Sequence, residues 1–107
     1  MSAKEVKKHK YLLNFLPDVS ADVNDAYDWY EKQIAGLGEQ FLTAIDASIN
    51  RIEREPKSFQ KIYLNVRKCN AKRFPFGIFF TTNKNIITVI AIVHLARHPK
   101  TWKKRRK

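Results

Sequence analysis

Hydrophobic and polar positions follow two different periods along this chain, and the change of period divides it into a helical part and a strand part. Residues 11–16 are rich in strand formers and stop at Pro17, which predicts a first strand. From residue 18 to about residue 35, apolar positions recur at helical spacing. A second amphipathic helix follows the turn at residues 36–38 and ends at Pro56, because the residue before a proline disfavours helical geometry. Two helices joined by so few residues predict an antiparallel hairpin.

After Pro56 the pattern changes to that of strands. Residues 62–70 alternate apolar and polar positions, which indicates one strand with one face in water. Residues 74–82 predict a second strand and residues 86–93 a third, whose nearly continuous apolar character favours a central place. Connections this short require antiparallel pairing. The predicted fold class is α+β: an N-terminal strand, a two-helix antiparallel hairpin and a three-stranded antiparallel meander, in a single domain spanning residues 1–107.

Charge is distributed unevenly between these two parts. Residues 1–60 hold 8 Lys/Arg and all 10 Asp/Glu, whereas residues 61–107 hold 13 Lys/Arg and no carboxylate, which together give the net charge of +11. A basic segment of this length repels itself unless an anion or an acidic partner lies against it. Nucleic acid, an acidic protein segment and anionic lipid all remain open as partners. The basic ends, residues 1–9 and 103–107, are expected to be mobile.

Composition narrows the cellular setting. No apolar stretch approaches the roughly 20 residues of a membrane-spanning helix, and the basic N-terminus lacks the features of a secretory signal. The single cysteine, Cys69, has no internal disulfide partner, which fits a reducing compartment. These features favour a cytoplasmic protein without a membrane partner.

Several local strings of this sequence, taken in their order and spacing, resemble the RelE/ParE superfamily of bacterial toxins. They cover the chain from about residue 10 to residue 102. The strings are Asp25-Ala26-Tyr27-Asp28-Trp29-Tyr30-Glu31, Gly36-Leu37-Gly38 with Phe41, Ile45-Asp46 with Ile49 and Ile52, Pro56, Ile62-Tyr63 to Val66-Arg67, Lys72-Arg73-Phe74-Pro75-Phe76-Gly77-Ile78-Phe79-Phe80, and Val89-Ile90-Ala91-Ile92-Val93-His94 with Arg97, Pro99 and Trp102.

The resemblance implies the toxin of a type II toxin–antitoxin module, a growth inhibitor neutralised by a cognate, acidic antitoxin. RelE-like members cleave messenger RNA on the ribosome without a metal, and ParE-like members inhibit DNA gyrase without being nucleases. Both share one fold, so the fold alone does not separate them. A non-toxic, basic nucleic-acid-binding domain is a further alternative. None of these readings calls for a cofactor, and the oligomeric state stays open.

Candidate site residues follow from the chemistry of metal-free RNA cleavage, which needs an acid–base group and cations around the phosphate. Histidine changes charge nearest neutral pH, so His94 is the natural acid–base candidate. Arg73 and Arg97 are suited to holding phosphate, which gives His94, Arg97 and Arg73 as the catalytic candidates. The positions expected to bind nucleic acid or another target are Arg67, Lys68, Lys72, Arg73, Arg97 and Lys100.

Most of these cations are expected to converge with His94 on one face of the sheet. His94 and Arg97 have the alternative of being structural or partner-contact residues, since the string Phe74-Pro75-Phe76-Gly77 is apolar where RelE-like enzymes carry more polar residues. The sequence after Trp102 also lacks the tyrosine that such enzymes use. Because His94 and His98 have no carboxylate or second cysteine nearby, no metal site is predicted.

Aromatic and acidic residues elsewhere are expected to be structural. Trp29 and its tyrosine neighbours should pack in the hairpin, and Trp102 should anchor the tail on the domain. Phe79 and Phe80 alternate faces, so only one of them should be buried, which leaves the other for the antitoxin. The carboxylates of the first helix are expected to form a solvated face.

Overall fold

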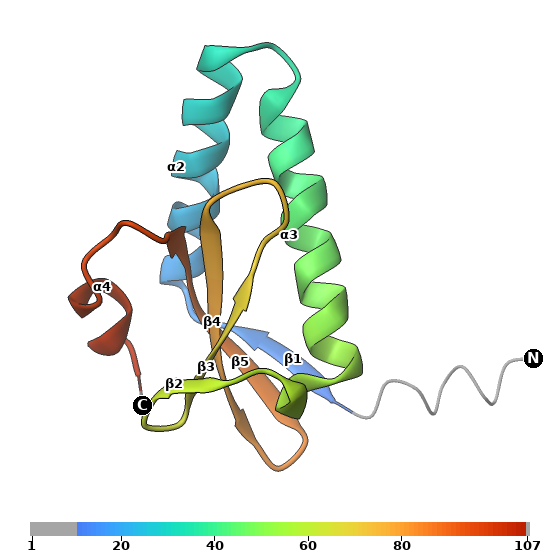
Figure 1. The fold of residues 1–107 in the computed structure, drawn as a ribbon, viewed down its shortest axis with the longest axis vertical. Coiled ribbons are helices and arrows are strands. Elements are labelled where there is room, and N and C mark those ends of the chain that lie inside the picture. Colours follow the sequence, from blue (N-terminus) through green and yellow to red (C-terminus); the bar gives the residue numbers. More distant parts are fainter. Residues whose placement is uncertain (1–10, 107) are drawn as a thin grey trace, which may run out of the picture.

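The computed structural model describes residues 11–106 and has the expected α+β class. One five-stranded sheet, in the order β1-β5-β4-β3-β2, carries a hairpin of two long helices on one face and a short helix on the other (Figure 1). The elements are β1 Leu12–Phe15, α2 Asp18–Gln33, α3 Leu37–Arg54, a short 3₁₀ helix Pro56–Ser58, β2 Lys61–Tyr63, β3 Val66–Asn70, β4 Phe76–Asn83, β5 Ile86–His94 and α4 Lys100–Lys103.

The sheet is mixed, with one parallel pair at its edge. β1 pairs parallel to β5, with Leu12 opposite Ile86, and the helical hairpin and three strands separate the two in sequence. β2 to β5 then form an antiparallel meander. β5, whose apolar run predicted a central strand, has a neighbour on both sides.

The expected single strand at residues 62–70 was wrong, because the chain reverses within it. β2 and β3 are two strands joined by a tight turn in which Leu64 has a φ of 50°. The meander therefore has four strands rather than three. Asn65, a residue type that favours turns, follows Leu64 here, but it also fits the polar position of an alternating strand, so the pattern continued through the turn.

The joint between α2 and α3 is built by one carboxylate. Gly36, with a φ of 91°, precedes α3, which begins at Leu37 and so includes part of the expected turn. Glu31 accepts hydrogen bonds from the backbone N–H groups of Gly36, at 2.8 Å, and Gly38, at 2.9 Å. Gly38 also has no room for a side chain, since a Cβ there would lie 2.8 Å from the Tyr27 ring. The acceptor caps N–H groups that the first turn of a helix leaves unpaired.

The sheet buries apolar side chains on both faces. Toward the hairpin, Tyr30 and Phe41 pack with Phe74 and Phe76, and their ring centroids lie 4.9–6.1 Å apart. Toward α4, Trp102 is stacked on Phe79 at 4.6 Å, so the expected anchoring of the tail by Trp102 is confirmed.

Both faces of the sheet are covered, and this makes one prediction about the aromatic residues of β4 wrong. Phe79 and Phe80 are both buried, at 4% and 0% exposed, although their side chains point to opposite faces. The expectation that only one would be buried assumed a solvated second face, which α4 removes.

The basic C-terminal run makes contacts with the rest of the domain within the described residues. Lys103 belongs to α4, with its Nζ 4.4 Å from the centre of the Tyr63 ring, and Arg106 donates a hydrogen bond to Asn65 Oδ1 at 2.8 Å. Arg105 is held by carboxylates of α2. Residues 1–9 and Lys107 lie outside the described residues. Within residues 11–106, no helix combines the length and apolar character needed to cross a membrane.

Candidate functional site

The end of β5 has an open edge, because β1 is shorter than its neighbour. β1 pairs with β5 only from Ile86 to Val89, and Leu16 adds one more backbone hydrogen bond to the Val89 carbonyl at 3.0 Å. Beyond this point β5 continues to His94 with β4 on its other side. The peptide groups that face away from β4 need other partners there.

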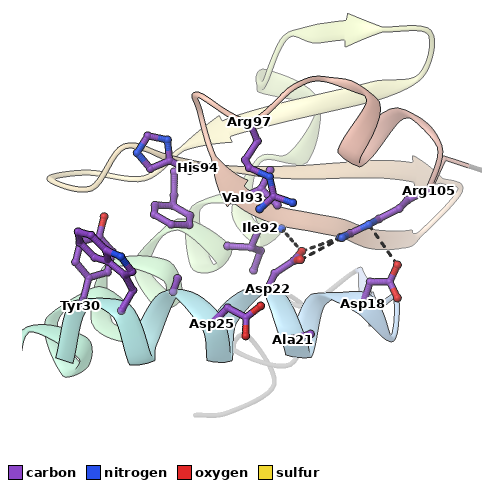
Figure 2. A pocket seen from close by; sticks show the side chains of 13 residues that line it. Asp18, Ala21, Asp22, Asp25, Tyr30, Ile92, Val93, His94, Arg97 and Arg105 are labelled. Atoms are coloured by element: carbon purple, nitrogen blue, oxygen red, sulfur yellow. Dashed lines mark hydrogen bonds and ion pairs between the residues drawn. The ribbon is translucent and has the colours of Figure 1, made fainter. Parts of the chain in front are cut away.

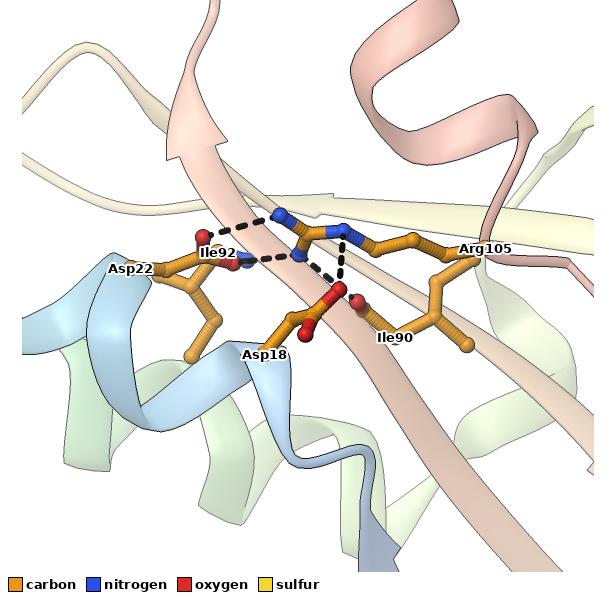
Figure 3. Close-up of polar contacts among 5 residues, drawn as sticks. All are labelled: Asp18, Asp22, Ile90, Ile92 and Arg105. Carbon is orange, nitrogen blue, oxygen red and sulfur yellow. Dashed lines mark hydrogen bonds and ion pairs between the residues drawn. The ribbon is translucent and has the colours of Figure 1, made fainter.

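Two charged side chains, distant in sequence, supply partners at the start of this open edge (Figure 3). Asp22 Oδ2 accepts the Ile92 N–H at 3.0 Å, and Arg105 Nη1 donates to the Ile90 carbonyl at 3.0 Å. The two side chains also pair with each other, because Arg105 Nη1 and Nη2 donate to the two carboxylate oxygens of Asp22, at 2.7 and 3.1 Å. We call this arrangement the edge latch.

The charged groups of the edge latch are largely shielded from water, which favours strong hydrogen bonds between them. The side chains of Arg105 and Asp22 are 13% and 9% exposed. The hydrogen bonds to Asp22 raise the pKa of Arg105 above its ordinary value, and burial opposes this only in part. Asp18 adds a carboxylate oxygen 3.3 Å from Arg105 Nε, but it is 64% exposed and contributes less.

The basic segment was expected to have an acidic partner, and α2 of the same chain supplies part of it. Asp22 does not belong to a solvated face, so that expectation was wrong for this residue. No periodic pattern links Asp22 to Arg105, which lie 83 positions apart.

Past the edge latch, a groove of about 660 Å³ runs between α2 and the end of β5 (Figure 2). Carboxylates and aromatic rings from α2 border one side, and β5 with the segment after it borders the other. Trp29 meets the Tyr30 ring edge-on, with centroids 5.5 Å apart, as expected for packing in the hairpin, but it is 60% exposed and lies outside the core. The lining residues are Asp18, Ala21, Asp22, Asp25, Ala26, Trp29, Tyr30, Phe76, Ile92, Val93, His94, Arg97 and Arg105.

Backbone polar groups of β5 also face this groove. Since the N–H of Ile92 points to Asp22, away from β4, the N–H of His94 two residues later points to the same edge. The Ile92 carbonyl faces that edge for the same reason, whereas the His94 carbonyl accepts the Arg97 N–H at 3.0 Å. The groove thus combines apolar rings, charges of both signs and free backbone groups, as protein-binding surfaces do.

His94 is oriented by its own loop. Its Nδ1 accepts the Ala96 N–H at 2.9 Å, so the neutral ring carries its proton on Nε2. The neutral ring then presents an N–H at Nε2 rather than the lone pair that a general base needs. Its edge also packs on Phe76, with ring centres 5.4 Å apart.

The structure divides the other sequence-predicted residues among different places. Arg97 shares the groove with His94, but Lys72 and Arg73 line a separate hollow beside α3. Arg67 donates hydrogen bonds to the carbonyls of Lys57, at 3.3 Å, and Phe59, at 2.7 Å, so it braces the segment after α3.

Lys68 and Lys100 stand on the remaining surface. Lys68 lies opposite Phe79 in the register of β3 and β4, so it shares the sheet face that α4 covers in part. Lys100 is exposed on α4. The expected convergence of the cations on one sheet face is therefore not found.

Neither a metal site nor the cysteine contributes to the groove in the described residues. In the described part of the chain, no group of three His, Cys, Asp or Glu side chains is placed to hold a metal ion. Cys69 is buried on β3 against α3, and burial raises the pKa of its thiol above the ordinary value. The residues of the site that sequence reasoning missed are Asp22, Arg105 and the exposed Trp29.

Comparison with known proteins gives a likeness in structure alone. No protein-family model and no curated protein matches the chain. A chain of the solved structure "Chromosomal ParDE TA system from P. aeruginosa" is similar to it with a TM-score of 0.72 and 19% identity. The match covers 80% of this chain and 97% of that one. The chain therefore has the fold of a ParDE component, which confirms the RelE/ParE-like fold that the sequence predicted.

Proposed function

We propose that this chain is the toxin of a type II toxin–antitoxin module, acting in the cytoplasm and neutralised by a cognate antitoxin. The observation that carries the proposal is the fold shared over 80% of the chain with a component of a ParDE system. The order of the sequence strings that resemble RelE/ParE toxins supports it independently.

For the cellular target, we favour a protein, with DNA gyrase as the specific candidate. The cations that a ribonuclease would gather around one phosphate lie in separate places, with His94 and Arg97 in the groove and Lys72 and Arg73 beside α3. α4 and Trp102 also cover part of the sheet face on which such a site would be built. An inhibitor that binds its target needs none of this convergence.

The groove is the surface that we assign to protein binding. Exposed tryptophan is unusual on a solvated helix face and frequent among the residues that dominate protein interfaces. Trp29 lies beside the open edge of β5, where Ile92 and His94 offer backbone groups to an added chain. The antitoxin is expected to carry an acidic segment for the basic surface of residues 61–107.

Induced expression separates the targets. Pulse labels for DNA and protein synthesis should show that replication falls first, and the purified chain should inhibit supercoiling by gyrase. The variant Trp29→Ala should fold normally and lose most of this inhibition. Its control is Ile34→Ala, which removes a side chain that is 65% exposed at the end of α2 and outside the groove. Equal inhibition by the two variants would remove the groove from the proposal.

A ribosome-dependent endoribonuclease is the second candidate, since His94 and Arg97 share a groove with Tyr30 and Asp25. In that case protein synthesis would stop first, with cleaved messenger RNA, and His94→Gln would abolish toxicity. Under the favoured proposal, His94→Gln keeps its toxicity, because the histidine is held by a backbone N–H and moves no proton. Growth that is unaffected by expression would contradict both candidates.

A further inference from the structure

A second hollow, on the far side of the helical hairpin from the groove, gathers four cations. It has a volume of about 390 Å³ and lies between α3 and the loop that joins β3 to β4. Its lining residues are Gln40, Thr43, Ala44, Ala47, Ser48, Asn50, Arg51, Arg54, Lys72 and Arg73. We call it the basic hollow.

The cations of the basic hollow come from two elements and are held in place there. Arg51 donates from Nη2 to Ser48 Oγ, at 3.2 Å, and to the Asn70 carbonyl, at 2.9 Å. Arg73 donates from Nη2 to Gln40 Oε1 at 3.2 Å. Each bond fixes one nitrogen of a guanidinium group, and within residues 11–106 the other nitrogens of these two groups make no hydrogen bond.

The backbone at Arg73 is strained in a way that favours this placement. Its φ of 73° lies in the left-handed region, which costs a non-glycine residue free energy. The loop thereby brings Lys72 and Arg73 to α3, although they lie far from its cations in sequence.

No carboxylate lines the basic hollow. Glu39, Asp46 and Glu53 of α3 stand next in sequence to the lining residues Gln40, Ala47 and Arg54, but none of the three lines the hollow. Arg54 and Lys72 form no hydrogen bond or ion pair within residues 11–106. Four cations gathered without a carboxylate among them create a local positive potential that attracts an anion.

We propose that the basic hollow binds the phosphodiester backbone of a nucleic acid. The choice over an acidic peptide rests on the rest of the lining, which is made of hydroxyl and amide side chains with only the two small residues Ala44 and Ala47. An amphipathic acidic segment needs a large apolar anchor, and none is present. No aromatic ring lines the hollow either, so it grips phosphates and does not stack bases.

The test is binding of the full-length chain to short fluorescein-labelled nucleic acids of mixed sequence, one DNA duplex and one RNA strand, over a range of salt. Arg54→Gln/Lys72→Gln should weaken binding about tenfold and lower the slope of log affinity against log salt by about 0.9 for each lost phosphate contact on duplex DNA. Whichever nucleic acid shows the loss is the source of the phosphate. Neither residue holds another part of the fold, so the variant should remain folded.

A control variant that loses the same number of positive charges distinguishes a specific site from attraction of nucleic acid by the whole basic surface. Lys61→Gln/Lys84→Gln removes two exposed cations outside the hollow and should change affinity by less than about twofold. Arg73→Gly and Lys84→Gly form a second matched pair, since both replace a cation at positive φ, 73° and 56°. Only the first of these should weaken binding.

Three outcomes would overturn the proposal. Equal loss in the test and control variants would mean diffuse attraction by the whole basic surface. Poly-glutamate that binds as tightly, with the same dependence on Arg54 and Lys72, would mean a carboxylate ligand. Absence of binding to either nucleic acid at low salt would exclude the site. Growth arrest is not a readout here, so the result is independent of the proposed toxin function.

Discussion

Asp22, Trp29 and Cys69 each have neighbours in sequence that suggest a role different from the one that the fold gives them. Asp22 stands among solvated carboxylates but holds the edge of β5, and Trp29 stands among packed tyrosines but is exposed. Cys69 follows two basic residues and is fully buried. Asp22 contacts β5 and Cys69 contacts α3, both distant in sequence, so the local pattern does not report these two roles.

The thiol of Cys69 should be protected in the folded protein. Burial raises its pKa, so the native state holds the proton more tightly than the unfolded chain. At neutral pH, Ellman's reagent should label the native protein at least about a hundredfold more slowly than the chain in urea, the factor that a local opening free energy of about 3 kcal/mol gives.

The same shift fixes the sign of a pH dependence. A group whose pKa is raised by folding contributes stability that is present below its unfolded pKa and lost as pH rises through the folded value. The free energy of unfolding should therefore fall more steeply in the alkaline range for the wild type than for Cys69→Ala. Equal slopes in urea melts at several alkaline pH values would contradict the burial of the thiol.

At the scale of elements, the helical hairpin depends on the carboxylate that caps α3. Glu31→Ala removes the acceptor of the Gly36 and Gly38 N–H groups and should cost about 1–2 kcal/mol. Thermal unfolding should then begin several degrees lower, at about 4–8 °C for each kcal/mol in a domain of this size. Asp28→Ala removes the same charge from an exposed position of α2 and is the control. Equal melting temperatures for the two variants would show that the cap contributes nothing.

The elements themselves were largely readable from the sequence, and the exceptions have physical reasons. Helical periodicity between Pro17 and Pro56 placed α2 and α3, because an amphipathic stripe and a terminating proline are local signals. The turn at Leu64 was missed because its turn-forming residue, Asn65, also fits the polar position of an alternating strand. α4 is one short turn that exists because Trp102 stacks on Phe79, a contact between distant residues.

The sequence predicted which residues of the candidate site lie together only where those residues belong to one segment of the chain. His94 and Arg97 lie together because they follow the same strand end. Lys72 and Arg73 were expected beside them, but the strand connection places these two against α3 on the other side of the hairpin. Asp22 and Arg105 meet only once the whole sheet has formed, so no spacing rule could link them.

For the whole molecule, α4 acts as the cover of the second sheet face. Trp102 is 6% exposed and lies against Phe79, so Trp102→Ala should cost about 3–5 kcal/mol. Trp29→Ala removes the same side chain from a position that is 60% exposed and should change stability by no more than about 0.5 kcal/mol. Urea melts followed by far-UV circular dichroism measure both. A similar, small effect of the two changes would mean that the sheet does not need its cover.

The edge latch joins the first helix, the last strand and the C-terminal segment, so its strength is a property of the whole fold. Asp22→Asn and Arg105→Gln should each cost about 2 kcal/mol, because the partner left behind is a poorly solvated charge beside backbone groups that it also serves. The double variant should cost less than the sum of the two, with a coupling of about 1–2 kcal/mol in a double-mutant cycle.

Asp18 supplies the comparison for this cycle. It meets the same guanidinium group but is 64% exposed, so Asp18→Asn should cost less than about 0.5 kcal/mol and couple weakly to Arg105→Gln. Additive effects of Asp22→Asn and Arg105→Gln would instead mean that the two side chains stabilise the edge of β5 separately. Long-range attraction between opposite charges would then join the basic C-terminal run to the acidic first helix. In that case the melting temperature of the protein would fall steeply with added salt rather than stay nearly constant.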